Sequence, residues 1–401
     1  MPGAALPGQM EPEPIPADPN EPPPKPDPRY EELPLTEKAE KTFKKQINDI
    51  NRILSAGRFA ENQQQLFDKF FEEYALARWT QQRNLNNLTS YRQELRAQFR
   101  RAKSGQVFEH LNALALKFFS KLAAGNYHPA VRVNAMLAIG ELNRVEQTSI
   151  DTPPIPLPDA LKVLIAALND AKMPDAVRAA AMVGIFRHVL SGNLDEESRR
   201  SLTAGLLRLV ADDLPDGPAR AGREWILAQA FETLGLLQGT IDGHAVYQAL
   251  LAGAANTKLS LSTRAVAVRA LGFLDSAQLG NVNVLQAATT LAEFLAEGCK
   301  EVAAAAKNNE QAADQRRRIK YFLEATITAL KGAEGRSRTG LAALARDGNQ
   351  QSLINELHQN LKELSDWLED KQTEEKSMAP KVAELQEKLA AWLSKAKSDK
   401  A

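Results

Sequence analysis

Apolar residues recur at helical spacing through most of the chain, most clearly in the segment 128–142. The apolar positions of this segment follow the pattern i, i+4, i+7, i+8, i+11 and are Val131, Ala135, Ala138, Ile139 and Leu142. This pattern predicts an amphipathic helix. We expect Pro129 in its first turn, where a missing N–H costs nothing, with Asn126 upstream accepting from a free amide. Small residues such as Gly140 predict close approach of a neighbouring helix.

The same sequence pattern recurs further along the chain. Its shared positions are a proline at the start of the helix and an arginine three or four residues later, namely Pro129 and Arg132, then Pro174 and Arg178. The two arginines are 46 residues apart, and Arg264 follows 86 residues later, close to two further steps. The copy expected between them, 225–235, has Leu227 where the arginine belongs. A single amphipathic helix cannot bury its apolar face by itself, so the recurrence of the pattern predicts that several such helical units stack on one another.

A period in the forties, built of two helices and a short turn, resembles HEAT repeats over roughly 105–332. A long proline loop at 148–158 interrupts the period. The resemblance implies an all-α, alpha-alpha superhelix, or solenoid, in the HEAT/armadillo-like class. In that family an acidic or amide residue of the turn and an arginine of the second helix commonly form a ladder. The residues that match are Asp170 with Arg178, and Asn256 with Arg264.

The pattern divides the chain into four parts. Residues 1–34 are rich in proline and carry a net charge of −5, which predicts a disordered acidic tail; a ligand for a proline-recognising groove is the alternative. Residues 35–104 form an N-terminal helical cap, and residues 105–335 about five helix pairs. Residues 336–401 show a 3-4 spacing typical of a coiled-coil seam. They predict a helical hairpin that turns near 378–380 and caps the last repeat, with self-association as the alternative.

Two basic clusters are candidate partner-binding sites. On the helix expected at 88–103, three arginines at i, i+4 and i+8 form a stripe suited to phosphate or an acidic partner, namely Arg92, Arg96 and Arg100. The second cluster consists of Arg316, Arg317 and Arg318. A solvated helix face is the alternative for both.

Composition and motifs point away from catalysis. Lys plus Arg equals Asp plus Glu at 50 each, so no global charge recruits nucleic acid. The single Cys299 excludes a disulfide framework, and the five histidines show no metal-ligand spacing. There is no phosphate-binding glycine loop and no G-x-S-x-G elbow. We therefore expect no catalytic residue, cofactor or metal. We expect Cys299 to be a small buried hydrophobe and His188 to lie at the polar edge of its helix.

Targeting signals are also missing from the pattern. No apolar run reaches the roughly 18 residues needed to span a bilayer. The start at Met1 has neither a basic nor an apolar leader, which favours a cytoplasmic protein. An acidic, proline-rich start also fits an exported protein whose signal has been removed.

These features favour a non-enzymatic scaffold that binds another protein on the concave side lined by the second helices. One alternative is a HEAT-like nucleic-acid-binding protein or an enzyme, since alkylpurine DNA glycosylases and bilin lyases share this architecture. Trp225 and Arg223 are the only hints of it, and the neutral net charge argues against it. A further alternative is an exported, envelope-associated assembly factor tethered by the proline-rich segment.

Overall fold

A computed structural model describes most of the chain. The described residues are 27–147, 149, 151–192, 194–307, 311–370, 372 and 377–398. Within them the chain forms fifteen α-helices and one two-stranded sheet, so the predicted all-α class is confirmed. Of the proline-rich tail expected at 1–34, residues 1–26 lie outside the described residues.

The N-terminal region contains three α-helices joined by irregular helical turns. These helices are α1 (Glu37–Ala56), α2 (Gln63–Phe70) and α3 (Leu88–Ala102). The helix α2 ends at Phe70 and is followed by a π-helical turn, Phe71–Ala75. Thr36 caps α1, since its Oγ1 accepts from the Ala39 N–H at 3.2 Å.

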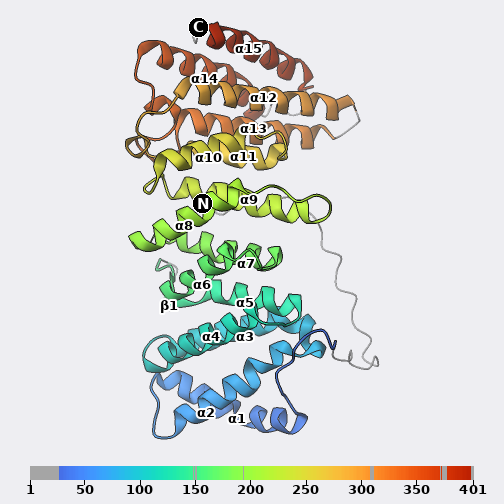
Figure 1. Ribbon diagram of the computed structural model, residues 1–401, viewed down its shortest axis with the longest axis vertical. Helices are drawn as coiled ribbons and strands as arrows, with labels where there is room; N and C mark the ends of the chain where they lie inside the picture. Colours follow the sequence, from blue (N-terminus) through green and yellow to red (C-terminus); the bar gives the residue numbers. More distant parts are fainter. Residues whose placement is uncertain are drawn as a thin grey trace.

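Ten helices follow as five pairs. They are α4 (Gln106–Ala124), α5 (Pro129–Glu141), α6 (Pro158–Asn169), α7 (Asp175–Leu190), α8 (Glu196–Ala211), α9 (Ala219–Leu236), α10 (Gly243–Ala255), α11 (Leu261–Leu271), α12 (Val284–Lys307) and α13 (Ala312–Lys331). The second helices pack in one row, with α5 against α7, then α9, α11 and α13 in succession. The first helices α6, α8, α10 and α12 form a parallel row. Figure 1 shows the pairs following one another along the long axis of the molecule.

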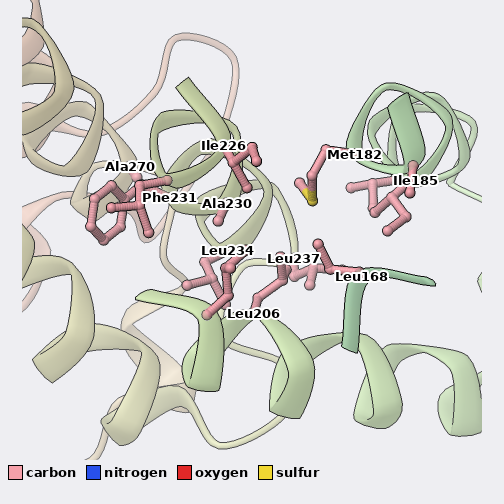
Figure 2. Packing of buried hydrophobic residues seen from close by; sticks show 14 of the residues in the cluster. Leu168, Met182, Ile185, Leu206, Ile226, Ala230, Phe231, Leu234, Leu237 and Ala270 are labelled. Atoms are coloured by element: carbon pink, nitrogen blue, oxygen red, sulfur yellow. The ribbon is translucent and has the colours of Figure 1, made fainter. Parts of the chain in front are cut away.

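The apolar core is continuous through the stack. Figure 2 shows this where Leu168 of α6, Met182 of α7, Leu206 of α8 and Leu234 of α9 meet. All four are at most 1% exposed and belong to one buried cluster that runs from the N-terminal region to the C-terminal helices. No pair therefore has a core of its own, because each buries its stripe against its neighbours.

Local caps fix where the second helices begin. Pro129 is the first residue of α5, as expected, but the cap is His128, whose Nδ1 accepts from the Ala130 N–H at 3.2 Å. The expectation that Asn126 would cap this helix is wrong, because its Nδ2 donates to the Arg29 carbonyl at 3.0 Å. Pro174 lies one position earlier relative to α7, directly before the first helical residue.

Residues 29–33, assigned from composition to the tail, lie against the helical body. The Glu31 N–H donates to the Asn126 carbonyl, and the Leu33 N–H donates to Thr80 Oγ1, both at 2.8 Å. Gln81 Nε2 returns a bond to the Leu33 carbonyl at 2.8 Å. The tail boundary at residue 34 thus differs from the structure, because backbone hydrogen bonds hold this short segment in place.

Two departures from the helical pattern occur elsewhere. The proline loop expected at 148–158 includes part of a small antiparallel sheet, β1 (Asn143–Val145) with β2 (Ile155–Pro156). The C-terminal hairpin consists of α14 (Gly348–Glu369) and α15 (Ala379–Ser398). It packs on the last pair, α14 against α13 and α15 against α12, and Trp392 Nε1 donates to the Leu353 carbonyl at 2.9 Å.

Candidate functional site: a groove across α3, α5 and α7

A groove of about 440 Å³ crosses the row of second helices near its N-terminal end. Three helices contribute most of its lining, namely Arg96, Phe99 and Arg100 of α3, Leu137, Gly140 and Glu141 of α5, and Val183, Gly184 and Arg187 of α7. The segment around the small sheet closes one end with Asn143 and Pro154. The groove therefore brings together residues from positions 96 to 187.

The floor of the groove is the closest approach of α5 and α7. A Cβ on Gly140 would lie 2.7 Å from the Gly184 Cα, so only glycine fits at this crossing. Leu137 and Val183 stand beside the glycines, and Val183 is 47% exposed. The floor is thus apolar and open to a ligand. The sequence predicts only the close approach of a neighbouring helix at Gly140, and α7 makes that approach.

Arg187 forms one side of the groove and completes the end of α5. Its Nη1 donates to the Gly140 carbonyl at 2.9 Å, and its Nη2 donates to Asn143 Oδ1. Burial lowers the pKa of the Arg187 guanidinium from its usual value. The last carbonyls of a helix lack internal partners, so this arginine satisfies one of them. Spacing along the sequence did not single out Arg187.

The arginine stripe of α3 is divided between two roles. Arg96 binds the Glu141 carboxylate in bidentate fashion, with Nε donating to Oε2 at 2.8 Å and Nη2 donating to Oε1, and Arg92 Nη1 lies 3.8 Å from the same carboxylate. These two arginines fasten α3 to α5. Arg100 is exposed, lines the groove, and has no ion pair within the described parts of the chain. Of the three candidate arginines, Arg92 and Arg96 thus contact Glu141, and Arg100 lines the groove with the paired Arg96 beside it.

The second basic cluster does not form one surface. Arg316 Nη2 donates to the Leu368 carbonyl at 2.7 Å, and its guanidinium lies 5.0 Å from the Trp367 ring centroid. Arg317 pairs with Asp314 of its own helix, and Arg318 pairs with Glu301 of α12 at 3.2 Å. All three side chains of this candidate cluster contact groups of the same chain, and Arg316 fastens α14 to α13.

The arginines of the repeat cap the first helix of their own pair. Each donates from Nε to the carbonyl of the next-to-last residue of that helix, Arg132 to Ala123 at 2.9 Å, Arg178 to Leu168 at 3.1 Å and Arg264 to Ala254 at 2.9 Å. A cation is favourable there because a helix carries partial negative charge at its C-terminus. The three bonds are one contact repeated along the row.

The ladder implied by the family resemblance is corrected. Asp170 Oδ1 accepts from the Lys172 N–H at 2.9 Å, and Asn256 Oδ1 accepts from the Lys258 N–H at 3.0 Å. Both side chains thus close their own turns instead of meeting Arg178 and Arg264. Arg178 Nη1 lies 3.5 Å from Asp175 Oδ1 instead. Short polar side chains such as Asp and Asn commonly accept from a backbone N–H two residues on, and this local bond competes with contacts to residues distant in the sequence.

The groups capable of acid–base or metal chemistry are dispersed. His188, expected at a polar edge, is 3% exposed, and burial lowers its pKa to about 4. Cys299 is fully buried, and burial raises its pKa to about 12. Arg223 Nη2 lies 3.4 Å from Asp175, while Trp225 stays 38% exposed. Among the described residues no cluster of three or more His, Cys, Asp or Glu side chains is placed to hold a metal ion.

Comparison with known proteins gives no relative. No family model, curated protein or solved structure matches the chain. In the part of the chain that the structure describes, no helix combines the length and apolar character needed to cross a bilayer.

Proposed function

We propose that the chain is a HEAT-like solenoid that binds another protein on the face of its second helices, with the groove across α3, α5 and α7 as the principal contact. The single observation that carries the proposal is the groove itself, an apolar floor edged by the Arg100 guanidinium, which has no ion pair among the described residues. Two rows of helices packed in register along one axis support the solenoid assignment.

The chemistry of the groove defines the partner that would fit. Leu137 and Val183 offer an apolar floor for one or two side chains of an extended segment. Arg100 at the edge can bind a carboxylate of the same segment in bidentate fashion. Protein interfaces are built in this way, from a desolvated apolar centre and a polar rim.

Other exposed apolar side chains extend the surface along the same row. Leu190 of α7 is 62% exposed and Trp225 of α9 is 38% exposed. Neither side chain lines the groove, which remains the principal contact. A scaffold needs no catalytic group at this surface, and binding alone is its proposed activity.

The test is site-directed capture with the full chain. A photoreactive residue at Val183 should crosslink one specific protein from the native cell extract. The same residue at Ala166, which is exposed on the first helix α6, should not. The variant Val183→Glu should lose the captured protein at least about tenfold, because a carboxylate on the floor costs more than 1.4 kcal/mol to desolvate. Equal capture by Val183→Glu and Ala166→Glu would refute the proposed site.

A further inference from the structure

The arginine cap found in three of the five helix pairs is missing from the pair α8–α9. In the pairs α4–α5, α6–α7 and α10–α11, an arginine of the second helix donates to the next-to-last carbonyl of the first. In the pair α8–α9 the corresponding position of the second helix is Leu227. Leu227 is 3% exposed and cannot donate a hydrogen bond. The question is what satisfies the end of α8.

The carbonyl that lacks its arginine belongs to Val210, the next-to-last residue of α8. The Asp212 N–H donates to the preceding carbonyl, that of Leu209, at 3.3 Å. Among the hydrogen bonds of the described residues, none reaches the Val210 carbonyl. In α10 the equivalent carbonyl, Ala254, receives the bond from Arg264. The Val210 carbonyl at the end of α8 is therefore an open acceptor, whereas the equivalent carbonyls of α4, α6 and α10 each accept an arginine N–H.

A pocket of about 290 Å³ opens at this end of α8. Its apolar wall includes Leu227 and Phe231 of α9, and Figure 2 shows Phe231 next to Ala270 of α11. Gly253 of α10 also lines the pocket and packs closely on Phe231, since an added Cβ would lie 2.5 Å from its ring. Val210 and Leu227 both line the pocket, so its volume lies beside the position at which three other pairs place an arginine.

The charge at the rim of this pocket is negative. Asp212 and Asp213 line it and are exposed, against the single ammonium of Lys258. No side-chain ion pair within 4 Å is formed by these three among the described residues, although Asp212 acts electrostatically on the Arg178 guanidinium and Arg220 Nη2 donates to the Lys258 carbonyl. Two carboxylates and the carbonyl end of a helix favour a cation. Two carboxylates alone are too few ligands for a divalent metal cage.

We infer that this pocket binds an arginine side chain supplied by a partner protein, which completes the cap that the chain itself omits. The inference rests on the proposed function, because a bound protein must provide the side chain. The apolar wall fits the methylene stem of arginine, and its five N–H donors suit a carbonyl and two carboxylates together. Lysine offers a smaller, more strongly hydrated point charge and fits this set less well.

The experiment uses the full chain with methyl-labelled Leu and Val and an acetylated, amidated Gly-Leu-Arg-Leu-Gly peptide as the probe. Binding should shift the methyl signals of Val210 and Leu227, with millimolar affinity. The same peptide with citrulline, which has the shape of arginine without its charge, should bind about tenfold more weakly, and the lysine peptide should also be weaker. Absence of shifts at Val210 and Leu227, or equal affinity for citrulline, would overturn the inference.

Variants of the pocket provide matched controls. The exposed double variant Asp212→Asn with Asp213→Asn should weaken the arginine peptide about tenfold. Lys258→Ala should tighten it, because the competing cation is gone; lower stability without tighter binding would show that Lys258 itself caps Val210. Leu227→Arg should abolish binding by filling the pocket from within, while Leu227→Met should keep it.

This assay separates the inference from the proposed function. The probe needs no natural partner, so its failure to bind refutes the arginine pocket whatever happens at Val183. Conversely, selective binding of the probe with no Val183-dependent capture would refute the proposed interaction face and leave the pocket in place.

Discussion

The glycine crossing beneath the groove leads to a sharp prediction for Gly184→Ala. An added Cβ would lie 2.8 Å from the Gly140 Cα and 2.8 Å from Leu164 Cδ1, so it is blocked on both sides. Carbon atoms in contact normally keep about 3.5–4.0 Å apart, so α7 must move relative to α5 and α6. Such overpacking costs up to about 3 kcal/mol, which the better helix propensity of alanine offsets by about 1 kcal/mol. We expect the free energy of unfolding to fall by about 2 kcal/mol.

The matched control is the same substitution at Gly222 of α9, where an added Cβ has no atom within 4 Å. Gly222→Ala should raise the free energy of unfolding by about 0.5–1 kcal/mol through helix propensity alone. Both variants are compared with the parent by urea unfolding, followed by far-UV circular dichroism. If Gly184→Ala proved as stable as Gly222→Ala, the close packing of α5 on α7 would be refuted, and the floor of the groove with it.

Three further predictions concern the buried imidazole of His188 and two arginines that bond backbone carbonyls, Arg316 and Arg264. The pKa of His188 is about 4 in the folded chain and about 6.5 in the unfolded chain, so between these pH values only the unfolded chain binds the proton. The free energy of unfolding should therefore fall by up to about 3 kcal/mol as the pH drops from 6.5 to 4. In urea unfolding at several pH values, His188→Leu should remove this pH-dependent part. Arg316→Ala should accelerate limited proteolysis near the α14–α15 hairpin, whereas Arg317→Ala, which loses only a bond within α13, should not. Arg264→Leu should lower the free energy of unfolding by about 2 kcal/mol in thermal unfolding, because the Ala254 carbonyl loses a charged donor; an unchanged midpoint would contradict the cap.

The candidate site was only partly accessible to sequence reasoning. Arg96 and Arg100 stood out because arginines four residues apart share a helix face, and both line the groove. Val183 and Arg187 did not, since a single exposed valine or arginine carries no pattern. The pairing of Arg96 with Glu141 joins residues 45 apart, a contact that depends on how α3 lies on α5. The groove is a property of that packing.

What the sequence determined by itself is local. The 3-4 rhythm of apolar residues, Pro129 at the start of α5 and the recurring arginine follow from helix geometry within a few residues, so they fixed the helices and the order of their pairs. Only the tertiary structure decided which polar partner each arginine took. It also decided that Asp170 and Asn256 close their own turns, and that the Val210 carbonyl, opposite Leu227, stays open beside a pocket. The physical reason is that periodicity states which face of a helix is buried, whereas a hydrogen bond depends on ångström-scale placement of helices that no spacing along the chain specifies.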